Sequence, residues 1–238
     1  MHAKSAAQGP TRMTTGRDRI LGRIRERLGR SALTPEQRES MWSRNRERRL
    51  APASAKPQGL ADAFANDIAT RGITVGRCRS WLDAGREIAQ YVNAKELGLV
   101  VRADGGPHLR DLRLQQYGIE VQSGPADAND AITLTEPLCA IAETGAAVAY
   151  AAPDRPATLN FVAKTHVMVL AESRVVASLE DSWGVLRSEL AAMPRYVVWI
   201  AGVSSTSDIE HNMVRPAHGP TNVHIVLVAD ASERAARR

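Results

Sequence analysis

The sequence predicts an α/β protein in which a mainly parallel sheet is flanked by helices, preceded by an N-terminal helical arm. From residue 60 onward, short apolar runs alternate with segments of helical periodicity. The chain has 238 residues and is 44% hydrophobic, which is enough to bury one substantial core. Its aromatic content is only 4%, so aliphatic side chains must fill that core.

Charge separates the arm from the rest of the chain. Residues 1–50 hold 13 Lys and Arg against 5 Asp and Glu, a balance of +8. The whole chain carries +5, so residues 51–238 carry −3. A mildly acidic body is not expected to bind nucleic acid. We therefore divide the chain into a flexible tail (1–16), a basic helical arm (17–55), an α/β domain (56–231) and a second flexible tail (232–238).

The arm is predicted to contain two helices. Across residues 17–30, the apolar positions Ile20, Leu21, Ile24 and Leu28 fall on one helical face, and arginines cover the remainder. Thr34-Pro35-Glu36-Gln37 is typical of a helix start, and the polar segment that follows runs to about residue 50. Such an arm is either a solvated lead-in that packs a few residues on the body or a docking element for an acidic partner protein. RNA binding ranks third, because no aromatic residues are interleaved with the arginines.

The elements of the α/β domain follow from local patterns. Residues 60–71 form a helix because Leu60, Phe64 and Ile68 are spaced four apart, and residues 81–95 and 179–193 are amphipathic in the same way. Short apolar runs predict the strands, and short helices are expected in two of the segments between them. The expected strands are 73–78, 99–101, 119–121, 131–134, 146–151, 166–170, 196–201 and 223–228; the expected short helices are 108–116 and 159–163, with a helical turn through residue 141.

Cysteine usage and hydropathy narrow the class of protein. Cys78 and Cys139 are far apart and neither belongs to a C-x-x-C pair, so we expect two reduced, buried thiols and no disulfide, metal or iron–sulfur site on this chain. No apolar run approaches the length that spans a bilayer, and the start lacks the apolar region of a signal peptide. A cytoplasmic protein without membrane association is therefore expected.

The segment after the strand at 196–201 has the composition of a binding loop. Gly202 ends the apolar run, and Ser204, Ser205 and Thr206 can each cap a short helix whose first turn contains Asp208. Unpaired N–H groups at that helix start would bind an anion. The strand at 196–201 is predicted to belong to the mainly parallel sheet, so this loop is expected at a carboxyl strand end, where open sheets bind ligands. The five residues named here are therefore predicted to contact a ligand.

His218-Gly219-Pro220 precedes the last strand, so a turn holds the backbone of His218. His218 is a candidate acid–base group or a donor to a substrate carboxylate, with Gly219 beside the ligand. The alternative is a histidine that only bonds within its loop. His166 and His224 lie inside strand-like runs and are interpreted as histidines with satisfied hydrogen bonds.

Glu143-Thr144-Gly145 forms the third unusual segment. The chain bends sharply at Gly145 before it re-enters the sheet, which would place Glu143 in a crowded, small-residue environment as a base or nucleophile. Thr144 and Gly145 would then contact the ligand. A carboxylate that merely holds the loop explains the pattern equally well. We expect all three segments to converge around one hollow.

Together these motifs resemble the LUD domain family and, within it, lactate utilization proteins of the C type. The resemblance rests on Ala140-Ile141-Ala142-Glu143-Thr144-Gly145, on residues 202–210 and on His218-Gly219-Pro220 before an apolar strand. It implies the fold shared by ribose phosphate isomerases, glucosamine phosphate deaminases and CoA transferases. It also implies a part in oxidising L-lactate to pyruvate, with no cofactor on this chain and iron–sulfur clusters on partner subunits.

Two departures from the family's Gly-Pro-Ser-Arg-Thr pattern lie at Val203 and Ser205. Without the arginine, backbone N–H groups and hydroxyls must hold a small carboxylate or phosphate-like anion. Two hypotheses follow. The chain is a cluster-free accessory component of a lactate utilization system, or it is an independent acyl- or CoA-transferase-like or ligase-like enzyme that uses Glu143.

Overall fold

The computed structural model describes residues 15–29, 31, 33–46, 59–204, 206–207, 213–214 and 218–229. The chain divides into two compact units, residues 1–50 and residues 51–238. In the part of the chain so described, none of the helices combines the length and the apolarity needed to cross a bilayer.

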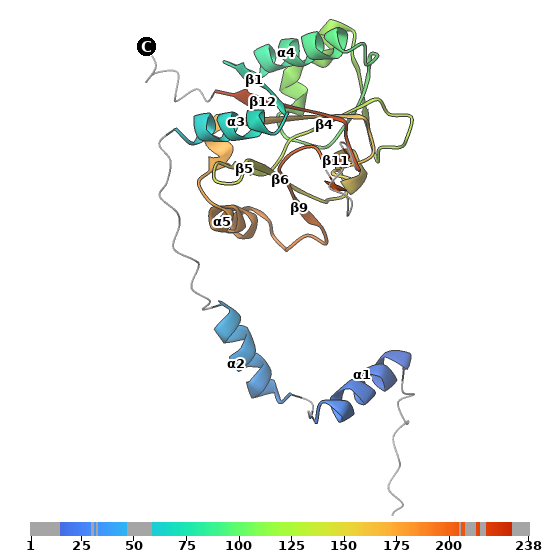
Figure 1. Ribbon diagram of the computed structural model, residues 1–238, viewed down its shortest axis with the longest axis vertical. Helices are drawn as coiled ribbons and strands as arrows, with labels where there is room; N and C mark the ends of the chain where they lie inside the picture. The colour runs from blue at the N-terminus through green and yellow to red at the C-terminus, as the bar shows by residue number, and fades with distance from the viewer. Residues whose placement is uncertain are drawn as a thin grey trace, which may run out of the picture. The chain divides into compact units, whose positions relative to one another are not determined.

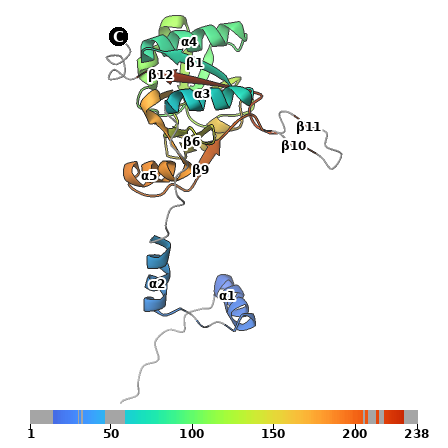
Figure 2. The ribbon, with the colours of Figure 1, turned by 60° about the vertical axis from the view of Figure 1, so that its left-hand side comes forward.

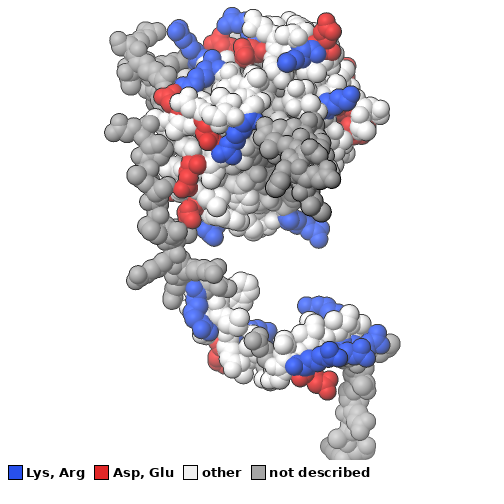
Figure 3. Space-filling view, in the orientation of Figure 1, with Lys and Arg blue, Asp and Glu red and all other residues white. Residues whose placement is uncertain are grey.

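The first unit contains α1 (Gly16–Arg27) and α2 (Pro35–Arg46). The Thr34 N–H donates to Gln37 Oε1 at 2.9 Å, and the Gln37 N–H donates to Thr34 Oγ1 at 3.2 Å, so the predicted helix start is confirmed. No residue of α1 is buried, and its apolar positions Ile20 and Ile24 are 61% and 48% exposed. Figure 3 shows Lys and Arg side chains gathered on these helices.

The second unit is built on a six-stranded sheet in which all strands are parallel. This sheet confirms the predicted α/β class. In spatial order its strands are β1 (Thr74–Cys78), β12 (Asn222–Val228), β7 (Thr165–Ala171), β4 (Ile132–Thr135), β2 (Val100–Ala103) and β3 (Glu120–Ser123). The longer strands are buried along nearly their whole length, as expected for a sheet covered on both faces.

A second sheet of four strands was not expected. Its order is β8 (Val175–Val176), β5 (Cys139–Ile141), β6 (Ala146–Tyr150) and β9 (Val197–Ile200). The predicted helical turn through residue 141 is wrong, because residues 139–141 form a fully buried strand. β5 and β6 make an antiparallel hairpin around the Glu-Thr-Gly bend, so each strand satisfies the backbone groups of the other.

The strand expected at 196–201 also lies in this second sheet. β9 pairs antiparallel with β6 and occupies the sheet edge, so its residues are half-buried rather than buried on both faces. It therefore does not present a carboxyl end of the parallel sheet. β10 (Thr206–Ser207) pairs antiparallel with β11 (Met213–Val214), and the helical first turn expected at Asp208 lies outside the described residues.

The layers of the second unit are visible in Figures 1 and 2. α4 (Trp81–Ala94) covers one face of the parallel sheet, and α3 (Leu60–Thr70) with the second sheet covers the other. α5 (Leu179–Glu189) packs on the outer face of the second sheet. Short helices connect these layers: η1 (Leu109–Leu112) and η2 (Leu114–Tyr117) in place of the predicted 108–116 helix, η3 (Ala157–Asn160) and η4 (Glu172–Arg174).

Candidate functional site

Two of the three predicted segments line one cavity, which we call the inter-sheet cavity. Its volume is about 420 Å³. β9 and the residues after it form one wall, and the first residues of β7 and β12 with the turns before them form the other. The lining residues are Asn160, Phe161, His166, Val198, Trp199, Ile200, Ala201, Gly202, Ser204, His218, Gly219, Pro220 and Val223. Walls that are mostly apolar with a few polar groups are typical of small-ligand sites.

Exposure separates a rim from a floor in this cavity. Ser204, His218 and Gly219 are exposed and form the rim. His166 and Asn160 are buried and form the floor. Gly219 has a φ of +75°, a left-handed conformation that glycine adopts without strain, and this turn brings His218 to the rim.

His166 differs from the satisfied histidine that we expected. Its Nε2 lies 2.8 Å from Thr135 Oγ1, but its Nδ1 is buried and has no hydrogen-bond partner among the described residues. In the part of the chain that the structure describes, Asn160 Oδ1 is likewise buried without a partner. Burial lowers the pKa of His166 to about 4, so its ring is neutral at physiological pH. Sequence reasoning missed both residues as ligand candidates, because only the fold shows that one atom of each is unpaired.

The Glu-Thr-Gly bend does not line the inter-sheet cavity. The side chain of Glu143 is exposed rather than crowded, and its backbone N–H donates to Ala177 O at 3.1 Å. Thr144 Oγ1 is buried, and no described residue forms a hydrogen bond with it. Gly145 has a φ of +60° and packs on the side chain of Asp67. The bend is therefore a packed hairpin turn.

α3 connects the bend to the end of β9. Asp67, which packs on Gly145, forms an ion pair of 2.7 Å with Arg71. Arg71 in turn donates to Ala201 O at 3.3 Å, directly before Gly202. The bend and the Gly202 corner thus lie at the same end of the second sheet, but only the corner reaches the cavity. Ser205 and Asp208 lie outside the described residues, and Thr206 is described only as part of β10.

A second polar cluster lies at the carboxyl ends of the neighbouring strands β2 and β4. From β2 the chain continues to β3 on one side, and from β4 it returns to β7 on the other, so this is a topological switch point of the sheet. Asp104 accepts from the Gly106 N–H at 2.9 Å and from Arg155 at 3.2 Å, and Glu136 lies 2.6 Å from His108 Nδ1. Burial raises the pKa of Asp104 to about 6, against the opposing effect of Arg155. A neighbouring cavity measures about 580 Å³.

The polar groups of this carboxyl-end cluster already bond to one another. Arg155 also donates to Glu136 O at 2.6 Å, and Glu136 accepts from the His108 N–H at 2.9 Å. A network whose polar groups satisfy one another stabilises the topological switch point between β2 and β4. The Asp104-Gly105-Gly106 sequence after a predicted strand was the signal that could have located it.

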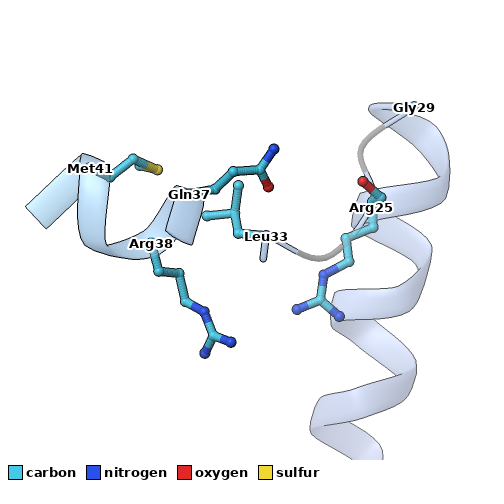
Figure 4. Close-up of a pocket in the computed structure, with 7 residues that line it drawn as sticks. Arg25, Gly29, Leu33, Gln37, Arg38 and Met41 are labelled. Carbon is cyan, nitrogen blue, oxygen red and sulfur yellow. The ribbon is translucent and has the colours of Figure 1, made fainter. Parts of the chain in front are cut away.

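Other features are weaker candidates. In the first unit, a depression of about 670 Å³ is bordered by exposed side chains, with Arg25 on one side and Arg38 and Met41 on the other (Figure 4). Exposed side chains alone do not enclose a ligand. Burial raises the pKa of Cys78 to about 11 and that of Cys139 to about 12, so neither is a thiolate at neutral pH. Among the described residues, no three His, Cys, Asp or Glu side chains are grouped to hold a metal ion.

Comparison with known proteins agrees with the motifs. Residues 127–228 match the LUD domain. Lactate utilization protein C of Bacillus subtilis is 26% identical over 160 residues, 55% of this chain and 66% of that protein. The protein of the same name from an Exiguobacterium species is 31% identical over 106 residues, 43% of this chain and 45% of that protein. The aligned regions of these relatives thus span less than two thirds of their length.

A solved structure supports the fold. The crystal structure of a DUF162 family protein from Deinococcus radiodurans superimposes with a TM-score of 0.52 at 17% identity, and the match covers 72% of this chain and 99% of that one. The region that matches the LUD domain, residues 127–228, contains the Glu-Thr-Gly bend, the Gly202 corner and the His-Gly-Pro turn. The resemblance of this chain to the LUD domain family, and to lactate utilization protein C within it, is therefore confirmed.

Proposed function

We propose that this chain is a component of an L-lactate utilization system and that it binds a small carboxylate in the inter-sheet cavity. One observation supports this most: the Gly202–Ser204 corner and the His218-Gly219 turn, about fifteen residues apart in the sequence, line a single cavity. The names of the relatives direct the proposal toward lactate.

The rim supplies the groups that would hold a carboxylate. The Ser204 hydroxyl and the His218 imidazole N–H are hydrogen-bond donors, and both side chains line the cavity at exposed positions. A charged acceptor strengthens such bonds. The apolar wall, which includes Ile200 and Val223, suits the short carbon chain of the ligand.

We assign the electron-transfer chemistry to partner subunits. Oxidation of lactate to pyruvate releases two electrons and two protons, and an electron acceptor must receive the electrons. An iron–sulfur cluster commonly needs four cysteine thiolates, whereas this sequence contains two cysteines. In this proposal the chain is the cluster-free, accessory component. The transferase alternative finds no support in this geometry, because Glu143 is exposed and does not line the cavity.

Calorimetric titration of the full chain with L-lactate tests the proposal. We expect saturable binding, and we expect His218→Ala and Ser204→Ala each to weaken it roughly tenfold, because each removes a bond to a charged acceptor. Glu143→Ala is the matched control, since this exposed residue lies outside the cavity, and it should leave the affinity unchanged.

Two results would contradict the proposal. One is the absence of binding for L-lactate, pyruvate and propionate at millimolar concentrations. The other is binding that is insensitive to His218→Ala and Ser204→Ala but lost in Glu143→Ala, which would move the site to the Glu-Thr-Gly bend and favour the transferase alternative.

A further inference from the structure

Two residues of the floor of the inter-sheet cavity each carry a polar atom that has no hydrogen-bond partner among the described residues. These atoms are His166 Nδ1 and Asn160 Oδ1. His166 is 0% exposed and Asn160 is 5% exposed. A buried polar atom left unpaired destabilises the fold, because it loses its hydrogen bonds to water without a replacement. Two residues that line one cavity and that each carry such an atom require a common explanation.

The neutral ring of His166 carries one N–H. With its pKa lowered to about 4 by burial, the ring stays neutral across physiological pH. Thr135 Oγ1, 2.8 Å from Nε2, has a hydroxyl hydrogen to donate. When Thr135 donates to Nε2, the ring proton lies on Nδ1, and His166 carries an N–H that is still to be paired. The floor then offers one donor, His166 Nδ1–H, and one acceptor, Asn160 Oδ1.

A hydroxyl group matches this pair because it accepts and donates at once. A ketone oxygen only accepts, so it would leave Asn160 Oδ1 unpaired, and a methylene group would leave both atoms unpaired. We propose that His166 and Asn160 are specificity-determining residues that bind the 2-hydroxyl of a short 2-hydroxy carboxylate. The inference rests on the proposed function, in which the rim binds the carboxylate of the same ligand.

The ligand panel provides the first test and requires no substitution. Full-length protein is titrated with L-lactate, pyruvate and propionate, which share a carboxylate and a three-carbon chain but differ at the second carbon. We expect L-lactate to bind at least roughly tenfold more tightly than either of the others, because sites built around a hydroxyl reject analogues that lack it.

Variants of the floor provide the second test. Asn160→Ala and His166→Leu should each reduce the ratio of lactate affinity to propionate affinity toward one. His224→Leu is the matched control for His166. His224 is also buried, and burial also lowers its pKa to about 4. One of its ring nitrogens likewise lies 2.8 Å from a threonine hydroxyl, although in His224 this nitrogen is Nδ1. It does not line the cavity, so its substitution should leave the ratio unchanged.

The outcomes separate this inference from the proposed function. Binding of all three acids with equal affinity, still weakened by His218→Ala, would overturn the inference and leave the proposed function intact. The same holds if Asn160→Ala leaves the wild-type ratio unaltered, because the floor would then hold only an ordered water. Absence of binding by any of the three acids would overturn both.

Discussion

Gly145 has a backbone φ of +60°, and a Cβ atom added there would lie 2.0 Å from Asp67 Oδ2. An L-residue in this conformation costs about 1–2 kcal/mol, and the contact with Asp67 would also disturb the ion pair of Asp67 with Arg71. This glycine therefore determines how closely the Glu-Thr-Gly bend packs on α3.

We expect Gly145→Ala to reduce the free energy of unfolding by about 2–3 kcal/mol, measured by urea denaturation. Gly184→Ala is the control, because Gly184 lies in α5 and, apart from its chain neighbours and the nearby backbone of α5, no described atom lies within 4 Å of its added Cβ. Alanine is favoured over glycine within a helix, so this variant should gain up to about 1 kcal/mol. Equal effects of the two substitutions would show that the bend is not tightly packed.

His166 shows why a residue's role depends on its surroundings rather than on its type. His166 and His224 read alike in the sequence, and each bonds one ring nitrogen to a threonine hydroxyl. Because Val223 pairs with His166, the two histidines point to opposite faces of the parallel sheet. His224 stacks on Tyr91 of α4 at 4.2 Å, whereas His166 lines the inter-sheet cavity.

Among the helices, α5 has a start that the sequence specifies locally. Ser178 Oγ accepts from the Asp181 N–H at 3.2 Å, and Asp181 Oδ2 accepts from the Ser178 N–H at 3.2 Å. This reciprocal capping satisfies two backbone donors at the helix start. Leu186 then packs α5 on the second sheet, and Trp183 lies 4.9 Å from Trp199 of β9.

Ser178→Ala should lower the free energy of unfolding by about 1 kcal/mol, because it removes the side-chain half of the cap. Ser188→Ala, in the same helix, removes only a bond to the Val185 carbonyl and should change stability by less than about 0.5 kcal/mol. Urea unfolding followed by tryptophan fluorescence reports on both variants. A loss for Ser188→Ala equal to that for Ser178→Ala would count against the cap.

Three buried groups determine how the stability of the whole domain depends on pH. Burial lowers the pKa of His166 and of His224 from 6.5 to about 4. The stability from these two histidines is present above about pH 6.5 and is lost as the pH falls toward 4, because only the unfolded chain is protonated in this range. Burial raises the pKa of Asp104 from 3.8 to about 6. Its contribution is opposite in sign, since it is present below about pH 3.8 and lost as the pH rises through 6.

Between pH 6 and pH 5 these three groups leave the unfolded state with about one more bound proton than the folded state. The free energy of unfolding should therefore fall by about 1.4 kcal/mol per pH unit on acidification. In His224→Gln, His166 and Asp104 nearly cancel, so the profile should be almost flat. Urea unfolding at intervals of 0.25 pH units measures both slopes. A wild-type profile that rises on acidification would contradict the assignment of neutral histidines.

Local sequence patterns determined much of this protein. Four-residue spacing predicted α3, the Ser80 and Ser178 positions cap α4 and α5, and apolar runs located all six strands of the parallel sheet. The Gly202 corner and the His-Gly-Pro turn were recognised from composition, and the fold brings them to one cavity. Periodicity and turn chemistry act over a few residues, so they can be read without knowing the rest of the chain.

Only the tertiary structure decided which strands pair and which polar atoms stay unpaired. A strand at 196–201 reads the same whether it joins a parallel sheet or the edge of an antiparallel one, since either use has the same two-residue period. The sequence predicts that the Glu-Thr-Gly bend lines the same hollow as the Gly202 corner and the His-Gly-Pro turn, but the bend does not line the inter-sheet cavity. The sequence also does not indicate Asn160 as a ligand candidate. Whether a buried nitrogen or oxygen finds a partner depends on residues distant in the sequence, because hydrogen-bond satisfaction is a property of the folded packing.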